Sequence, residues 1–286
     1  MNKIIEQMLL QHEAITLEDK KNNIKEIIQE IVLCGLSRAG FFKVSAFYGG
    51  TALRIFHGLD RFSEDLDFSL MIRDESFDFN KYIPTLEKEI ASYGLNFKIA
   101  TKDKTVDSDI KSAFLKGNTR EHILLFYTDE QTARMVGGNE LIKVKFEVDT
   151  NPPDFATFER KYQLLPIPYE ITLYDMPSLF AGKIHAVICR AWKSRVKGRD
   201  LYDFVFYMTN RTVVNLPHLI ARLKQSGFID EKENPTIENI KQMLSERFGS
   251  IDYEQAKKDV LPFIKNPSTL DIWSKDFFCG ITENLK

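Results

Sequence analysis

The chain has 286 residues, of which 43% are hydrophobic, enough for one large domain or two domains of ordinary size. Its formal net charge of −2 excludes a protein that holds nucleic acid by overall positive charge, so any basic patch must be local. The cysteines Cys34, Cys189 and Cys279 form no Cys-x-x-Cys pair, which favours free thiols in a reducing compartment. No apolar run approaches membrane-spanning length and the N-terminus lacks a signal-peptide core, so the sequence predicts a soluble, cytoplasmic protein without a membrane partner.

The first predicted elements are helices. Between residues 2 and 34, apolar side chains recur at helical spacing with a break near Thr16, so we expect two helices. Gly35 to Gly40 reads as a connector. The apolar, β-prone stretch from Val44 to Tyr48 then predicts a short strand.

A pair of glycines follows this strand directly. We expect Gly49-Gly50 to form a turn and Thr51 to open a helix as its N-cap. Glycines let backbone N–H groups approach a phosphate beside a helix N-terminus, where the helix dipole favours an anion. The stretch therefore predicts a phosphate cradle.

Two aspartates come next. In the β-prone stretch from Glu64 to Ile72, Asp65 and Asp67 point to one face of a strand, while Leu66 and Phe68 point to the core. Adjacent carboxylates repel each other unless a cation lies between them, and a hard divalent ion such as Mg²⁺ suits oxygen ligands. Nucleotidyl transfer requires at least a metal-binding pair of carboxylates next to a phosphate-binding site, and this stretch predicts both.

The middle of the chain predicts an inserted helix and further strands. A helix is expected over Asn80 to Tyr93, closed by Gly94, and strands over 95–101, 122–128 and 141–149. The last of these alternates cleanly. Its apolar face carries Ile142, Val144, Phe146 and Val148, and its polar face carries Lys143, Lys145, Glu147 and Asp149.

The final part of the chain is predicted to be helical. Residues 164–174 contain Pro166 and Pro168 and suit an irregular edge strand. Helices are then expected over 177–193, 199–209, 214–226, 236–248, 253–263 and 269–283. The fold class is therefore α/β (α+β), a mixed sheet with flanking helices followed by an all-α C-terminal half, with domains at 1–175 and 176–286.

The first motifs resemble a known family. Gly49-Gly-Thr-Ala-Leu-Arg54, followed by Arg61-Phe-Ser-Glu-Asp-Leu-Asp-Phe68, resembles the signature of the AbiEii/AbiGii toxin family, which are nucleotidyltransferases of the DNA polymerase β-like superfamily. The resemblance implies a polymerase β-like core and a helical C-terminal domain that contributes active-site residues. It implies that Gly49, Gly50 and Thr51 hold the triphosphate of an NTP, that Arg54 and Ser63 support the loop, and that Asp65 and Asp67 bind Mg²⁺.

The resemblance also implies a third carboxylate on a neighbouring strand. Lys145-Phe-Glu147 is similar to the family pattern, which favours Glu147 as the third metal ligand. Asp149, on the same predicted face, is the alternative, although its place at the strand end also suits a cap of the following turn. Lys143 and Lys145 on this face either screen the carboxylates, meet phosphate or are simply solvated.

Two further matches lie in the helical half. Around Pro177 to Trp192 the resemblance implies an active-site lysine, Lys183, which would pair with the triphosphate. Arg199-Asp-Leu-Tyr-Asp203 is similar to the last family motif and implies an active-site aspartate, either Asp200 or Asp203, with Asp200 preferred. An N-cap is the structural alternative for Asp200. The basic loop 193–199 is either an RNA docking surface or merely solvated.

The resemblance implies a Mg²⁺-dependent transferase that moves NMP from an NTP to an acceptor hydroxyl. The acceptor would be RNA, with tRNA as a candidate and a protein as the main competitor. Such an enzyme would be the toxin of a type IV toxin–antitoxin or abortive-infection system, with an antitoxin partner. The alternative from another class is a nucleotide- or RNA-binding module on the same fold without turnover. A metal-dependent phosphohydrolase or nuclease is a weaker third hypothesis.

Overall fold

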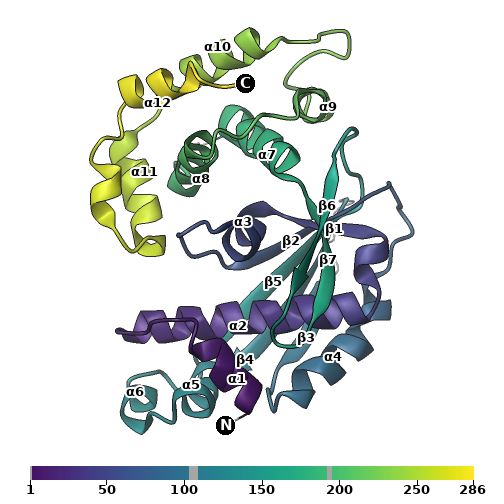
Figure 1. Cartoon of the computed structure of the whole chain (residues 1–286), viewed down its shortest axis with the longest axis vertical. Helices are drawn as coiled ribbons and strands as arrows, with labels where there is room; N and C mark the ends of the chain where they lie inside the picture. The colour runs from purple at the N-terminus through teal and green to yellow at the C-terminus, as the bar shows by residue number, and fades with distance from the viewer. Residues whose placement is uncertain (1, 103–108, 192–194) are drawn as a thin grey trace. The chain divides into compact units, whose positions relative to one another are not determined.

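The computed structural model describes residues 2–102, 109–191 and 195–286 (Figure 1). The chain divides into two compact units, and each unit is built from three separate stretches of the sequence. The first unit contains Met1–Thr51, Glu64–Pro152 and Arg160–Leu173, and the second contains Ala52–Ser63, Pro153–Glu159 and Tyr174–Lys286. The division into domains at 1–175 and 176–286 stays a prediction.

Across the described residues, seven strands form one mixed sheet in the order β3-β4-β5-β2-β1-β7-β6. The strands are β1 (Ser45–Tyr48), β2 (Asp65–Leu70), β3 (Lys98–Lys102), β4 (Ile110–Asn118), β5 (Leu141–Asp149), β6 (Phe158–Gln163) and β7 (Tyr169–Tyr174). β2 is antiparallel to β1 and parallel to β5, and β1 is parallel to β7. The aspartate strand β2 therefore lies inside the sheet, between β1 and β5.

Helices cover the sheet in the first unit. They are α1 (Lys3–Leu9), α2 (Leu17–Arg38), α4 (Ile83–Ser92), α5 (Thr119–Tyr127) and α6 (Glu130–Arg134). The long helix α2 lies across one face of the sheet (Figure 1). Thr16 caps α2 in a capping box with Asp19, because each side chain accepts a hydrogen bond from the other residue's backbone N–H. The predicted break near Thr16 is confirmed.

Buried aromatic side chains fix the register of β2. Phe68 is fully buried, and its ring lies 5.0 Å from the ring of Phe41 and 5.2 Å from that of Phe47, centre to centre. A slip of β2 by one residue would replace Phe68 in the core by an aspartate. Burial of the Phe68 side chain, worth about 1.5–3 kcal/mol, therefore also holds Asp65 and Asp67 on the opposite face.

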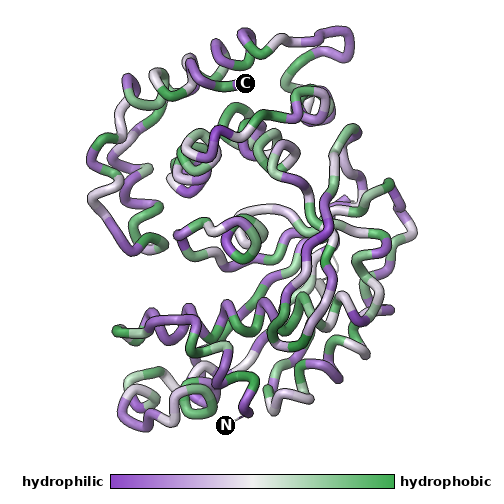
Figure 2. Tube along the Cα trace, viewed as in Figure 1, coloured by the Kyte–Doolittle hydropathy of each residue, from purple (hydrophilic) through white to green (hydrophobic). Residues whose placement is uncertain are grey.

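The second unit is helical. It contains α7 (Met176–Cys189), α8 (Gly198–Thr209), α9 (Leu216–Gln225), α10 (Ile237–Gly249), α11 (Tyr253–Val260) and α12 (Lys275–Thr282). Hydrophobic and hydrophilic residues alternate along α10 (Figure 2), and its Ile240, Leu244 and Phe248, spaced four apart, form the buried side. The predicted helical C-terminal half and the mixed α/β fold are confirmed.

One predicted strand is a helix. Residues 122–128 were expected to be extended, but α5 runs from Thr119 to Tyr127. The Asn118 side chain accepts from Glu121 N and caps this helix, and the side chains of Ile123 and Phe126, one turn apart, are buried. A short apolar run suits a buried strand and a buried helix equally, so the pattern of residues 122–128 alone does not decide between them.

Two strands were missed and one was placed wrongly. β4 and β6 were not predicted, because their sequences alternate poorly or are largely polar. The segment around 164–174 was expected to form an edge strand, but β7 pairs with both β1 and β6 and is internal. Pro166 and Pro168 lie in the loop before β7, so they do not interrupt its hydrogen bonds.

Candidate active site

The register between β2 and β5 brings carboxylates of the first unit together. In this parallel pair Asp65 lies opposite Lys145, and Asp67 lies opposite Glu147. Paired residues on neighbouring strands point to the same face and their backbones are about 4.8 Å apart. Glu147 is also paired with Ser112 of β4, whose hydroxyl donates to Oε1 of Glu147 at 3.3 Å.

Lys145 lies among these carboxylates. Its Nζ is 2.7 Å from Oε2 of Glu147. Burial lowers the pKa of Lys145, but the hydrogen bond to Glu147 and the charges of Glu147, Asp65 and Asp67 outweigh burial and raise the pKa. The charges of all three predicted metal ligands thus act on one ammonium group. We call Asp65, Asp67, Glu147 and Lys145 the strand group.

Gly49 lies directly against the strand group. It has a φ of +85°, and a methyl group added to its Cα would lie 2.6 Å from Oδ2 of Asp67. Only glycine combines this backbone conformation with such a close approach. Gly49 therefore sets the distance between the backbone at the start of α3 (Gly49–His57) and the Asp67 carboxylate.

Thr51 has a different role from the one expected. The helix α3 already begins at Gly49, so Thr51 is its third residue and the predicted N-cap is wrong. The Thr51 side chain is fully buried, and its hydroxyl donates to the backbone oxygen of Asp65. This hydrogen bond ties α3 to the first residue of β2. Gly50 precedes Thr51 as the second residue of α3.

Glu147 and Asp149 are separated by the register. Asp149 is level with Ser69, two residues beyond Asp67, whereas Glu147 is level with Asp67 itself. Oδ1 of Asp149 accepts from the N–H of Asn151 at 3.0 Å, as expected for a residue that caps the turn after the strand. The geometry favours Glu147 as the partner of Asp67.

The second unit holds a separate set of charged residues. Nζ of Lys183, on α7, lies 2.7 Å from Oδ1 of Asp200 and 2.8 Å from Oδ2 of Asp203, both on α8. Burial lowers the pKa of Lys183, but these two carboxylates outweigh burial and raise the pKa, so the lysine is a stable cation. The predicted lysine and both predicted aspartates are therefore neighbours.

The sequence reasoning missed one member of this set. Nε and Nη2 of Arg61 donate to the two oxygens of Asp203 at 2.5 and 2.7 Å, and Arg61 is only 3% exposed. Burial raises the pKa of Asp203, but Arg61 and Lys183 outweigh burial and lower the pKa. Arg61 stands in the first motif, four residues before Asp65, but its partner is 142 positions away and no local pattern reveals it.

Asp200 is not an N-cap. The helix α8 begins at Gly198 after Lys197, so Asp200 belongs to the first turn. Its side chain is almost fully buried, and its second oxygen accepts from Nη1 of Arg190. We call Arg61, Lys183, Arg190, Asp200 and Asp203 the helix group.

The remaining predicted residues have structural contacts. Nη1 of Arg54 donates to the backbone oxygen of Asp60 at 3.1 Å, so this side chain supports the loop after α3. Ser63 is 7% exposed at the end of that loop. In the basic loop, Arg195 pairs with Asp259 and Arg199 lies over the ring of Phe263, while Trp192 and residues 193–194 lie outside the described residues.

The predicted turn at Gly49-Gly50 is wrong, because both glycines belong to α3. The comparisons give the class of protein. Residues 31–277 match the family described as nucleotidyl transferase AbiEii toxin, type IV TA system. The chain belongs to this family of toxin nucleotidyltransferases. No curated protein matches the chain.

Solved structures resemble the chain at low sequence identity. MenT4, a nucleotidyltransferase toxin from Mycobacterium tuberculosis H37Rv, is 13% identical with a TM-score of 0.52, over 100% of this chain and 90% of that one. JHP933 from Helicobacter pylori is 15% identical with a TM-score of 0.45 over 90% and 87%. A putative nucleotidyltransferase from H. pylori is 17% identical with a TM-score of 0.43 over 89% and 88%. The likeness to MenT4 supports the fold alone.

Within the described ranges, no helix is both long and apolar enough to cross a membrane.

Proposed function

We propose that this toxin nucleotidyltransferase transfers NMP from an NTP to a hydroxyl of an RNA acceptor in a Mg²⁺-dependent reaction. The family supplies the reaction class and a nucleotide substrate. The observation that carries the metal dependence is the pairing of Asp67 with Glu147 on adjacent strands, two residues from Asp65. The proposal also includes Lys183 and one aspartate, either Asp200 or Asp203, as active-site residues.

The donor atoms of the strand group fit Mg²⁺. Asp65, Asp67 and Glu147 supply carboxylate oxygens, which a hard divalent cation prefers over nitrogen or sulfur ligands. When bound, the ion would neutralise phosphate charge and lower the pKa of the attacking hydroxyl. Lys145 is held beside Glu147 and keeps positive charge on this face, where it orients Glu147.

The chain's own groups account for substrate placement in this proposal. Gly49 has no side chain, so a phosphate approaches the backbone N–H groups at the start of α3 close to Asp67. Asp67 is held on this face by the buried Phe68 next to it. In the helix group, three cationic side chains accompany two carboxylates, and this excess of positive charge suits a substrate that carries phosphates.

The test separates transfer from binding alone. The protein is incubated with each α-³²P-labelled NTP, Mg²⁺ and separate pools of tRNA, rRNA or total protein. Labelled RNA supports the proposal, labelled protein identifies the competing acceptor, and NTP binding without label supports a binding module. Addition of EDTA should abolish labelling and excess Mg²⁺ should restore it, whereas labelling that survives EDTA contradicts the metal dependence. Released mononucleotide without labelled acceptor would indicate a hydrolase.

Asp67→Asn and Asp149→Asn form a matched pair for the same assay. Both changes remove one carboxylate charge from the same face of the sheet and preserve side-chain volume. We expect Asp67→Asn to lose labelling and Asp149→Asn to keep it. Loss of labelling in Asp149→Asn would overturn the register argument, and retained labelling in Asp67→Asn would remove Asp67 from the metal site.

A further inference from the structure

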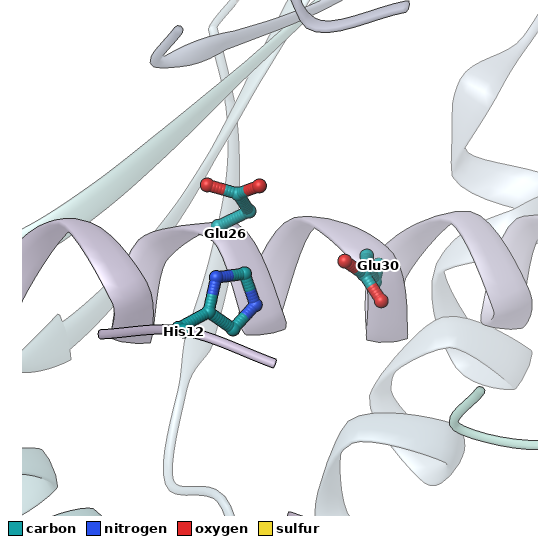
Figure 3. A group of neighbouring side chains, drawn as sticks. All are labelled: His12, Glu26 and Glu30. Atoms are coloured by element: carbon teal, nitrogen blue, oxygen red, sulfur yellow. The ribbon is translucent and has the colours of Figure 1, made fainter. Parts of the chain in front are cut away.

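A second group of metal-ligating side chains lies in the first unit, outside the strand group. His12 comes from the segment before α2, and Glu26 and Glu30 come from successive turns of α2 (Figure 3). Each offers one ligand atom, and these three atoms lie within 4.8 Å of one another. A tetrahedral zinc ion with bonds of 2.0–2.2 Å holds its ligands about 3.4 Å apart, so small side-chain rotations close this group on an ion.

The backbone around His12 is fixed in place. Nδ2 of Asn23 donates to the backbone oxygen of Glu13 at 3.1 Å, which ties the residue after His12 to α2. On the other side, the N–H of His12 donates to the oxygen of Leu9 at 3.0 Å, and Thr16 caps α2. The imidazole is therefore presented to α2 by a segment anchored at both ends, as a preorganised ligand requires.

A buried tyrosine, Tyr169, is the second observation near this group. Its side chain is 5% exposed, and its buried hydroxyl has no hydrogen-bond partner among the residues that the structure describes. The pKa of Tyr169 is raised well above its usual value, first by burial and then by the negative charge of Glu30. The backbone oxygen of the neighbouring Glu170 accepts from the Ser37 hydroxyl at 2.6 Å, so this end of β7 contacts α2.

An unsatisfied buried hydroxyl costs about 1–3 kcal/mol and calls for a nearby acceptor. Ligating carboxylates are generally hydrogen-bonded by an outer partner that orients them. The Tyr169 hydroxyl, which is unbonded among the described residues and whose pKa responds to the charge of Glu30, is the candidate for such a partner.

We propose that His12, Glu26 and Glu30 bind one divalent transition-metal ion of the zinc class, with the Tyr169 hydroxyl donating to Glu30. One imidazole nitrogen with two carboxylate oxygens suits Zn²⁺, whereas Mg²⁺ prefers oxygen ligands alone. The ion joins the segment that follows α1 to α2, and it is distinct from the Mg²⁺ of the strand group. Its role is structural, because it fastens the N-terminal segment onto the helix that covers the sheet.

The test is zinc binding by the full-length protein, independent of transferase activity. ZnCl₂ is titrated calorimetrically in the presence of millimolar Mg²⁺, and the melting temperature is measured with and without Zn²⁺. We expect one equivalent of Zn²⁺ to bind and the melting temperature to rise by about 5 °C at a free zinc concentration 100-fold above the dissociation constant. Absence of a stoichiometric binding event overturns the proposal.

Matched variants locate the site. His12→Gln and Glu30→Gln should each abolish the zinc-dependent rise in melting temperature, and the second, isosteric change tests the site even where the first weakens folding. His185→Gln and Asp67→Asn, which alter the second unit and the strand group, should still bind one equivalent. Retention of binding in His12→Gln and Glu30→Gln, or its loss in Asp67→Asn, overturns the assignment. Tyr169→Phe should weaken binding by about 10–100-fold, and an unchanged affinity contradicts the proposed hydrogen bond.

Discussion

The strand group and the helix group use the same side-chain chemistry in opposite environments. In the strand group, Asp65 is exposed, and the side chains of Glu147 and Lys145 are 26% and 33% exposed. In the helix group, Asp203 and Arg61 are almost completely buried and bound to each other through two hydrogen bonds. The difference teaches that carboxylates at a partly exposed sheet face remain accessible to a ligand, whereas the side chains of the buried Arg61–Asp203 pair are closed to solvent and bound to each other.

The largest expected effect is on catalysis through the strand group. Asp67→Ala should lower kcat/KM by about 10³-fold or more, because it removes a ligand of the proposed ion and leaves the core untouched. The melting temperature should change little, since Asp67 is only half-buried. Labelling kinetics and thermal unfolding measured on one preparation check both parts, and equal activity in variant and wild type would remove Asp67 from the site.

A large effect on stability is expected in the helix group. Arg61→Ala leaves the Asp203 carboxylate buried with one cation fewer and should reduce the free energy of unfolding by about 3–5 kcal/mol. Urea unfolding followed by the fluorescence of the buried Trp273 measures this change. As a control, Lys257→Ala removes a cation paired with the exposed Glu254 and should cost less than about 1 kcal/mol. A similar small cost for Arg61→Ala would contradict the contrast between the two groups.

A pH effect on stability is expected from two histidines of the helical unit. Burial lowers the pKa of His185 and His218 to about 4, with Arg222 adding to the shift in both. Between pH 6.5 and 4 the unfolded chain therefore binds more protons than the folded chain, so stability falls as the pH falls through this window. Once the pH is below both the folded and the unfolded pKa, each histidine lowers the free energy of unfolding by about 3 kcal/mol.

Unfolding in urea at pH 7, 5.5 and 4.5 measures this dependence. His185→Gln and His218→Gln should each flatten the loss of stability toward low pH. An unaltered slope in both variants would show that other groups carry the acid sensitivity.

The smallest expected effect comes from Gly49. Gly49→Ala places a methyl group against the Asp67 carboxylate at a positive φ, which should cost about 1–3 kcal/mol and shift Asp67 enough to lower activity by about tenfold. Gly58→Ala is a matched control, because Gly58 has a φ of +77° but, apart from its chain neighbours, no described residue lies within 4 Å of the added methyl group. We expect Gly58→Ala to lower the free energy of unfolding, because of its positive φ, but to keep full activity. Equal activity losses in the two variants would show that contact with Asp67 is irrelevant.

Local patterns in the sequence were enough for the fold class and for the positions of the strongest elements. The alternation over 141–149 predicted β5 with its exact ends, and Thr16 marked the start of α2. These succeed because side-chain periodicity and capping act over a few residues. The apolar run at 122–128 failed, because its length and composition suit a helix as well as a strand and tertiary packing chose between them.

The sequence by itself determined which residue types carry the chemistry: a glycine pair, an Asp-x-Asp strand, an alternating strand with Glu147, and a Lys183 helix. Only the tertiary structure decided which of these meet. The strand register made Glu147, and not Asp149, the neighbour of Asp67, and the fold of the second unit joined Arg61 to Asp203. Such pairings join residues from about 80 to 142 positions apart, so they follow from the packing of whole elements, which no short stretch of sequence encodes.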